Sequence, residues 1–512
     1  MQLRVIFCIL FSLPALLAQD SGAIVGTVTD PTNAAVVGAR VTLSNTDTSV
    51  SQQATTDSAG EYTFTPLRIG NYSLRVEMSG FTAAIRSGLV LNVQQRMRVD
   101  FALAVGAVDQ SIEIRGESPL LDTGTSSMGH VVQNKLIVDL PLNGRDYQQL
   151  AVGTVGTVPT GGQSRGNADF SANGARPLNN NFILDGVDNN SYVLDLQSFS
   201  SQAVSPSIDA VQEFKVQTNN FSAEFGRYGG AVVNVSIKSG TNEIHGSLFE
   251  FLRNNALDAN DFFNNRAGRK LPAFRQNQFG GTAGGPLIRN KLFLFGSYQG
   301  TRVAQGVTAV STVPTPAEHN GVFAVAIFDP ATTRGAGANA TRDAFPNNTI
   351  PASRFDPTGK RLVDVYPAPN LVGPNNFILN PGNRTGSNQY DTRFDWNISS
   401  RDTLFGRYSL TDQYGITPGP LPAPGVGQTN SSESPTTGHS AVLGQTHTFS
   451  PHVINDFRLG FNRLSTQRLP QVKERIIEEF GFKGLPFFSD ITGLPAVSVT
   501  GFQGLGEGGT LP

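Results

Sequence analysis

The chain has 512 residues, a formal net charge of −2 and only 15% charged residues, with 55 glycines and 34 phenylalanines. The near-neutral charge offers no broad basic surface, so no nucleic acid partner is expected. Abundant Gly and Phe with few charges are typical of a β-rich protein with many turns, and the length allows about two to four domains.

The first 18 residues have the pattern of a secretory signal peptide. One basic residue, Arg4, precedes an apolar run from Val5 to Leu17, and small residues place the cleavage site after Ala18. The run is too short to span a bilayer comfortably as a helix. We therefore predict export and removal of residues 1–18.

The only cysteine, Cys8, lies inside that segment, so the mature chain has none. A secreted eukaryotic module of this length usually contains disulfides, which this chain cannot form. No later stretch is apolar for about 18 residues, so the sequence predicts no transmembrane helix and a membrane-spanning form would cross as a β-barrel. An exported, β-rich chain without cysteine is typical of the Gram-negative outer membrane.

Residues 22–105 are predicted to form a β-sandwich. In the strand Asn71–Glu77, Tyr72, Leu74 and Val76 point inward between polar residues. The stretches GTVTDPTNAAVVGARVTLSN and TTDSAGEYTFTPLRIGNYSLRVEMSGF resemble the carboxypeptidase-regulatory-like domain. None of the six histidines has zinc-peptidase spacing, so we expect a spacer or docking module rather than an enzyme. The other predicted strands are Ala23–Thr29, Ala39–Ser44, Glu61–Thr65 and Arg96–Ala102.

Residues 106–240 have a mixed α/β pattern, with a short helix expected at Gln133–Leu140. The stretches NGARPLNNNFILDGVDNN and VQEFKVQTNNFSAEFGRYGGAVVNVSIKSGTNEIHGSLFEF resemble the plug and first barrel strand of TonB-dependent outer-membrane transporters. The Oar-like branch, which has a regulatory-like domain in front, is the most similar. The resemblance implies a plug signature of Asn173, Gly174, Arg176, Asp185, Gly186 and Asp188.

Two interpretations of Asp185 and Asp188 are open. They are either paired carboxylates for acid–base or cation chemistry, or parts of a turn. Asp-Gly is a strong turn sequence, and Asn189 and Asn190 continue it, which favours the structural interpretation.

Three arginines of the plug region, Arg145, Arg176 and Arg227, also have two interpretations. The resemblance suggests pairing with acidic groups on the barrel wall, and the alternative is that they are solvated. Polar contacts across a wet lumen are individually weak and can be rearranged. A plug that must move is therefore expected to be held by such contacts rather than by a large apolar core.

The segment that precedes the plug lies where members of this family present an extended segment to TonB. Strand addition to an energy-transducing partner needs an exposed backbone and β-branched residues, which the segment offers. The alternative, slightly favoured, is that it is the first plug strand. The possible TonB-contact residues are Val108, Ser111, Ile112, Glu113 and Ile114.

Residues 241–512 repeat amphipathic segments separated by turns. Around the turn Ser399–Asp402, an apolar face that includes Tyr390, Trp396 and Tyr408 is predicted to face lipid, with Phe405 assigned to the same aromatic girdles. The residues predicted to line a wet lumen are Asp391, Arg393, Asp395 and Arg407. The other predicted strands are Ile244–Arg253, Gln278–Leu287, Lys291–Arg302, Ser440–Phe449 and Val453–Asn462.

Residues 304–388 are rich in Pro, Gly and Asn and show little periodicity, so they are predicted to form a long functional loop. Plugged transporters close with about 22 strands. Residues 241–512 supply roughly eight by the length that each strand needs, which predicts a fragment of a longer protein.

Two short segments match the sequence patterns of catalytic or cofactor-binding motifs without the flanking elements that those motifs need. Gly162–Gly166 matches a nucleophile elbow but lacks the flanking strand and helix that the motif needs. Gly504–Gly509 matches a dinucleotide fingerprint with no helix after it. We expect neither to be functional.

The sequence thus predicts a mainly β protein with an N-terminal β-sandwich, an α/β plug domain and an incomplete antiparallel transmembrane β-barrel. The resemblance implies TonB-dependent transport across the outer membrane, with outer-membrane lipid, the TonB energy-transducing complex and an unknown extracellular solute as partners. No enzymatic activity and no cofactor are expected. The alternative is a cell-surface adhesion or carbohydrate- or peptide-binding β protein.

Overall fold

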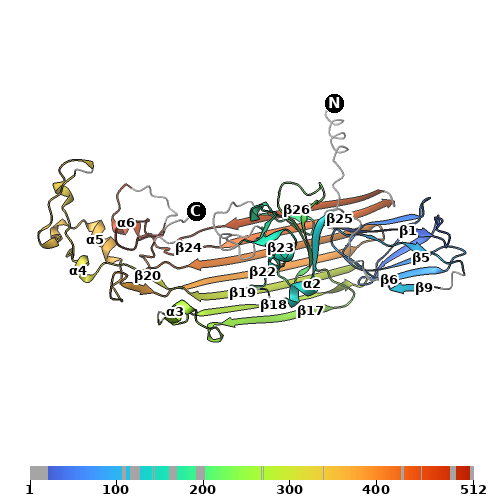
Figure 1. Cartoon of the computed structure of the whole chain (residues 1–512), viewed down its shortest axis with the longest axis horizontal. Coiled ribbons are helices and arrows are strands. Elements are labelled where there is room, and N and C mark those ends of the chain that lie inside the picture. The colour runs from blue at the N-terminus through green and yellow to red at the C-terminus, as the bar shows by residue number, and fades with distance from the viewer. Residues whose placement is uncertain are drawn as a thin grey trace, which may run out of the picture.

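The computed structural model describes residues 21–106, 111–115, 127–140, 142, 144–160, 170–191, 202–266, 268, 270–337, 340–427, 432–450, 453–484 and 492–507. The predicted signal peptide, Val108 and the Gly162–Gly166 motif lie outside these residues, and the Gly504–Gly509 motif lies only partly within them. Figure 1 shows a small N-terminal domain at one end of a long sheet, a plug against the middle of the sheet, and long connections at the opposite end.

The N-terminal domain consists of two facing sheets. Its strands are β1 (Gly22–Thr29), β2 (Arg40–Asn45), β3 (Ser51–Thr55), β4 (Glu61–Leu67), β5 (Gly70–Glu77), β6 (Ala83–Leu91), β7 (Arg96–Arg98), β8 (Phe101–Ala102) and β9 (Ser111–Arg115). One sheet has the order β4-β1-β7, with β8 also beside β1, and the other has the order β3-β2-β5-β6-β9. The sequence patterns did not predict β3 and β6, and the predicted strand Arg96–Ala102 is divided into β7 and β8.

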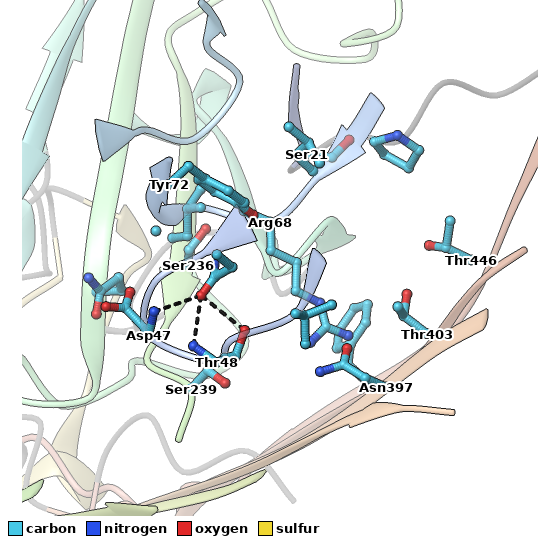
Figure 2. A pocket seen from close by; sticks show the side chains of 18 of the residues that line it. Ser21, Asp47, Thr48, Arg68, Tyr72, Ser236, Ser239, Asn397, Thr403 and Thr446 are labelled. Atoms are coloured by element: carbon cyan, nitrogen blue, oxygen red, sulfur yellow. Dashed lines mark hydrogen bonds between the residues drawn. The ribbon is translucent and has the colours of Figure 1, made fainter. Parts of the chain in front are cut away.

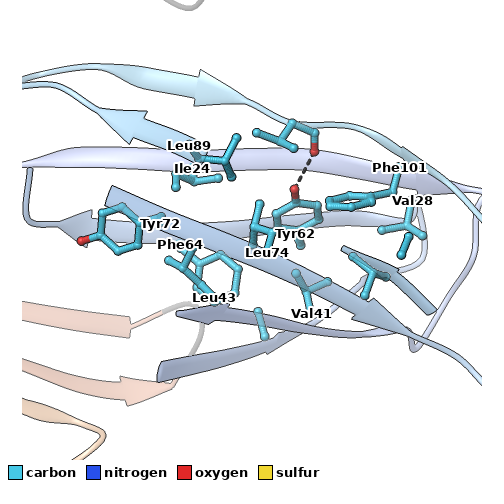
Figure 3. Close-up of a cluster of buried hydrophobic side chains, with 14 of the residues drawn as sticks. Ile24, Val28, Val41, Leu43, Tyr62, Phe64, Tyr72, Leu74, Leu89 and Phe101 are labelled. Atoms are coloured by element: carbon cyan, nitrogen blue, oxygen red, sulfur yellow. Dashed lines mark hydrogen bonds between the residues drawn. The ribbon is translucent and has the colours of Figure 1, made fainter. Parts of the chain in front are cut away.

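An apolar core lies between the two sheets (Figure 3). Strand β5 buries Tyr72, Leu74 and Val76, as its alternation predicts. Tyr62 is also buried, and its hydroxyl donates a hydrogen bond of 2.5 Å to the Val99 carbonyl. The domain therefore has its own core.

The region predicted to be a plug, which is called the plug below, is built around a five-stranded sheet. Its elements are β10 (Met128–Gln133), α2 (Asn134–Asp139), η1 (Tyr147–Gly153), β11 (Thr157–Pro159), β12 (Phe170–Ala172), η2 (Pro177–Asn179), β13 (Asn181–Leu184), β14 (Val187–Asp188), β15 (Val211–Asn219) and β16 (Val232–Ile237). The sheet order is β10-β15-β16-β13-β14. All residues of β16 are buried, because side chains cover both faces of this central strand.

The predicted barrel region forms one antiparallel sheet, called the wall below, with the order β17-β18-β19-β22-β23-β25-β26. The short β24 (Ser432–Glu433) pairs with β23. Its strands are β17 (His245–Asn254), β18 (Phe274–Ile288), β19 (Leu292–Gly306), β22 (Gly382–Asn397), β23 (Asp402–Thr417), β25 (Thr436–Ser450) and β26 (Val453–Thr466). The sheet is open, with β17 and β26 as its ends. Within the described residues, no helix is long and apolar enough to cross a membrane.

The hairpin β22–β23 orients its two faces as predicted. Tyr390, Trp396 and Tyr408 are 41–45% exposed on the outer face. The predicted lumen residues are 1–8% exposed, because the plug covers them: Asp391, Arg393, Asp395 and Arg407. The prediction that Phe405 belongs to the lipid-facing aromatic girdles was wrong. This side chain is only 9% exposed and shares the inner face with Arg407, two residues away, since side chains alternate along a strand.

The predicted loop 304–388 is shorter than expected and is folded. β19 extends to Gly306 and β22 begins at Gly382. A buried cluster joins Val313, Tyr366 and Phe377 of this connection to residues of later connections, Leu421 and Leu505. The short elements here and in the other connections are η3 (Asn255–Leu257), α3 (Phe262–Arg266), β20 (Ala309–Ser311), α4 (Pro316–His319), η4 (Pro330–Thr332), η6 (Pro346–Asn348), η7 (Ala352–Arg354), α5 (Pro357–Asp364), β21 (Phe377–Leu379) and α6 (Ile477–Phe480).

Candidate functional site

The centre of the candidate site is the turn between β13 and β14 of the plug. Leu184 pairs with Val187, and the two residues between them, Asp185 and Gly186, have φ values of 48° and 77°. Two positive φ values define the tight hairpin turn that Asp-Gly favours. The carboxylate of Asp185 accepts a hydrogen bond of 3.1 Å from the Ile237 amide, which ties the turn to the end of β16.

The same carboxylate is paired with two arginines of the wall. Its Oδ1 lies 2.8 Å from Nη1 of Arg393 on β22, and its Oδ2 lies 3.0 Å from Nε of Arg407 on β23. The Asp185 and Arg407 side chains are completely buried. A turn residue of the plug therefore joins two neighbouring strands of the wall.

Both arginines also donate to the backbone of the plug. Arg393 Nη1 donates to the Ile237 carbonyl at 3.1 Å, and Arg407 Nη2 donates to the Leu184 carbonyl at 3.4 Å. The planar guanidinium can serve several acceptors at once, which a lysine ammonium cannot do with the same geometry.

Two further carboxylates of the wall complete the set. Asp395 lies 3.0 Å from Nε of Arg393 and accepts a hydrogen bond of 2.6 Å from Ser239, directly after the plug sheet. Asp391 accepts from Ser409 at 2.6 Å, and Ser409 in turn accepts from Arg407 at 3.0 Å. Along β22, residues 391, 393 and 395 share one face because they alternate with outward-facing residues.

The third cation comes from the N-terminal domain. Arg68, between β4 and β5, places Nη1 2.8 Å from Oδ1 of Asp395. We call these six residues the plug–wall network: Arg68, Asp185, Asp391, Arg393, Asp395 and Arg407. Its three carboxylates and three guanidinium groups balance in charge. Balance matters here, because removing one partner of a buried pair costs about 3–5 kcal/mol.

The rest of the plug–wall contact combines polar and apolar groups. Ser207 of the plug and Ser297 of β19 share a hydrogen bond of 2.8 Å. Gln278 of β18 donates to the Gly144 carbonyl at 3.0 Å. Phe295 of β19 is the one wall residue in the main apolar cluster of the described plug. Within the described residues, the contact therefore relies mainly on polar groups and has no large apolar core of its own.

Of the three plug arginines, Arg145 fits neither of the two interpretations. Arg145 pairs with Asp209 of the plug itself, and its guanidinium lies 4.5 Å and 4.3 Å from the ring centres of Phe249 and Phe251 on the wall. Burial lowers the pKa of Arg145, and Asp209 opposes this shift. Arg145 therefore meets aromatic rings on the wall rather than acids.

The other two plug arginines are largely exposed, which agrees with the solvated alternative. Arg227 lies 3.5 Å from Asp188 of the plug, and Arg176 is exposed. The central ion pairs come from other residues: the acid, Asp185, is on the plug and the arginines, Arg393 and Arg407, are on the wall. Alternation along β22 predicted that Arg393 faces the lumen, but not which plug residue it meets.

The remaining residues of the predicted signature form a second tight turn. Asn173 and Gly174 have φ values of 51° and 78°, and the Asn173 side chain donates to the Thr218 carbonyl at 2.7 Å. This turn follows β12, which pairs with β11 in a separate two-stranded sheet, and it contacts the end of β15, whereas the Asp185 turn contacts the end of β16. The structure therefore does not bring the six signature residues into one cluster.

The predicted TonB-contact segment lies in strand β9, apart from Val108. β9 pairs in parallel with β6, from Ala83 opposite Ser111 to Ser87 opposite Arg115. It is thus an edge strand of the N-terminal domain, and the expectation of a first plug strand was wrong. Parallel pairing joins residues that are distant in sequence, so local pattern gave no sign of it.

No group of three or more His, Cys, Asp or Glu residues suited to a metal ion occurs in the part of the chain that the structure describes. In the plug–wall network, Asp185 and Asp395 are paired with arginines, and Asp391 is linked to Arg407 through Ser409. The network therefore connects the N-terminal domain, the plug and the wall through ion pairs.

Comparison with known proteins agrees with these parts. The model of the outer membrane beta barrel domain family matches residues 236–512, and that of the carboxypeptidase regulatory-like domain matches residues 23–104. The TonB-dependent transporter Oar of Myxococcus xanthus is 29% identical over 287 residues, which cover 54% of this chain and 26% of that protein. The aligned part thus spans about a quarter of the length of this curated relative.

Two solved structures are similar over most of this chain. The outer membrane transporter YddB of Escherichia coli has a TM-score of 0.45 and 13% identity, covering 75% of this chain and 43% of that one. The siderophore receptor PirA of Acinetobacter baumannii has a TM-score of 0.42 and 16% identity, covering 72% and 44%. Because the barrel family model matches more than half of its residues, the chain belongs to the outer membrane beta barrel domain family, is a homologue of the transporter Oar, and is a protein of the outer membrane.

Proposed function

We propose that this chain is the plug-bearing part of a TonB-dependent transporter that moves a scarce or bulky solute across the outer membrane. The observation that carries the proposal is the Asp185 turn, held between Arg393 and Arg407 on the inner face of the wall. Charged contacts of this kind hold a plug in a barrel and can be broken and remade. Residues 22–105, joined by strand β9, are then a docking domain, the rest of residues 106–240 is the plug, and residues 241–512 are the wall with its outer connections.

The direction of the chain in the membrane follows from the lengths of its connections. Short turns usually face the periplasm and long loops face outward. The turn 398–401 lies at the end that carries the N-terminal domain, and the folded connection 307–381 lies at the other end (Figure 1). The outer connections are thus placed to meet the solute, while β9 lies on the side where TonB acts.

The test is solute depletion from defined media by cells with and without TonB. Cells that produce the full-length protein should remove one or more solutes that cells lacking the gene leave behind, and loss of TonB should abolish the difference. Fractionation should recover the protein as a heat-modifiable outer-membrane species. Depletion that continues without TonB would contradict the proposal and favour an adhesion or ligand-binding role.

A further inference from the structure

The N-terminal domain contacts both the plug and the wall, through three of its turns. The turn after β6 meets the plug: Val93 donates its amide to Glu213 of β15, and Lys215 donates to the Gln94 carbonyl at 3.4 Å. The turn after β2 meets the segment before β17, where the Asn242 amide donates to the Asp47 carbonyl at 3.0 Å. These contacts hold the domain at the mouth of the barrel.

The third turn, between β4 and β5, carries Arg68. Besides its ion pair with Asp395, Arg68 donates from Nη2 to the Leu404 carbonyl of β23 at 3.3 Å. The backbone of Arg68 is held in turn, because the Tyr72 hydroxyl donates to its carbonyl at 2.7 Å. The side chain is 33% exposed, whereas that of Asp395 is 1% exposed. Arg68 thus reaches from an accessible turn to a buried carboxylate.

The space around Arg68 is a cavity of about 230 Å³, lined by polar and apolar side chains together. Polar side chains of all three parts line it, including Asn45 of the N-terminal domain, Ser236 of the plug and Thr446 of the wall. Figure 2 shows Arg68 extending from the N-terminal domain toward the wall strands that carry Asn397 and Thr403. Because the contact encloses a cavity rather than a continuous packed core, its opening should cost less than unfolding either domain.

Loss of Arg68 changes the charge balance next to the plug. Asp395 is shared by Arg68 and Arg393, and Arg393 is shared by Asp395 and Asp185. Without Arg68, three carboxylates face two guanidinium groups, and Arg393 is the remaining arginine paired with Asp395. The hold of Arg393 on the plug turn is then weaker.

We propose that the N-terminal domain is an autoinhibitory brace: docked, it supplies Arg68 to the plug–wall network and keeps the plug seated, and it must undock before the plug moves. This inference rests on the proposed function for the movement of the plug. It also gives the pairing of β9 with β6 a role. If TonB exerts force on β9, that force acts on the N-terminal domain through this pairing before it acts on the plug.

The test is hydrogen exchange of the full-length protein in outer-membrane vesicles, without TonB or solute. The reporters are the amides of Asp185, Ile237 and Val93, which are hydrogen-bonded at the plug turn, at the network and at the docking contact. Arg68→Gln should speed exchange at all three by about tenfold, as expected for loss of one hydrogen bond to a charged group. Arg68→Lys keeps the positive charge but not the planar, forked guanidinium. It should therefore increase the exchange rates less than Arg68→Gln does.

The matched control is Arg75→Gln in the same domain. Arg75 pairs with Glu77 at 2.7 Å on β5 and is 45% exposed, away from the plug. It should leave the three reporters unchanged. Equal exchange in Arg68→Gln and wild type, or equal acceleration by Arg75→Gln, would overturn the brace. If Arg68→Gln does not assemble, Arg68→Lys decides by the same criterion. Normal TonB-dependent uptake is not needed for this result. A failed uptake test would refute the transporter, while the exchange rates would still show whether Arg68 keeps the plug seated.

Discussion

The core of the N-terminal domain and the plug–wall network hold the molecule together by opposite means. The core buries Ile24, Leu74 and Val76 completely between two sheets. The network buries Asp185 and Arg407 as completely, but between two parts of the chain that share little apolar surface. Apolar burial is non-directional and tolerates small shifts, whereas a buried ion pair is stable only with its full set of partners. An apolar core therefore suits a domain that stays folded, and a buried ion-pair network suits a contact that opens as a unit.

The largest effect is expected for Asp185→Asn, which tests whether the plug–wall network depends on its full set of charges. The variant keeps an acceptor for the Ile237 amide but leaves Arg393 and Arg407 without the plug charge. Removing one member of a buried ion pair should lower the free energy of plug unfolding by about 3–5 kcal/mol. The measurement is the urea midpoint for proteolysis of the plug in detergent micelles, while the wall remains folded.

Asp188→Asn, at the other end of the same hairpin, is the control. Its partner Arg227 is 62% exposed and 3.5 Å away, and exposed pairs contribute about 0–1 kcal/mol. The change should therefore be small. Equal midpoints for the two variants would show that the network contributes nothing beyond ordinary surface pairing.

A somewhat smaller effect is expected in the apolar region. Leu74→Ala leaves a cavity in a completely buried position, which costs about 3 kcal/mol. The loss should appear as a lower unfolding midpoint of the N-terminal domain, followed by proteolysis between β1 and β8. The midpoint of the plug should change little. A plug destabilised as much as the domain would contradict the separation of the two cores.

The smallest expected effect is a pH dependence at the docking contact. Burial raises the pKa of Glu213 to about 7, against the lowering effects of the Val93 amide and Lys215. Between the ordinary pKa and this value the folded protein binds more protons than the unfolded chain, so stability is highest at low pH and falls as pH rises through about 7.

Glu213→Gln removes this titration and keeps a hydrogen-bond acceptor for Val93. The variant should therefore be more stable than wild type at pH 8, by about 1–2 kcal/mol, and equal to it near pH 4. Urea titrations of plug proteolysis at the two pH values measure this. A wild-type protein whose plug stability does not change between them would refute the raised pKa.

Much of the local structure could be predicted from sequence because it depends on neighbours along the chain. Alternation placed Tyr72, Leu74 and Val76 inward and put Asp391, Arg393 and Asp395 on the inner face of β22. Asp-Gly chemistry predicted the turn at Asp185. In contrast, β3 was missed because Ser51–Thr55 lacks an apolar alternation, and the connection 307–381 appeared structureless because its elements are short.

The sequence by itself determined that the chain is a mainly β protein with a plug-like region and amphipathic wall strands, since period-2 patterning and turn residues act over a few positions. Only the tertiary structure decided which charges meet. Asp185 and Arg393 are 208 residues apart, and Arg68 is farther still from Asp395. Such pairs depend on how three separately folded parts dock, which no local pattern encodes. The same holds for β9, whose partner β6 belongs to the domain before it.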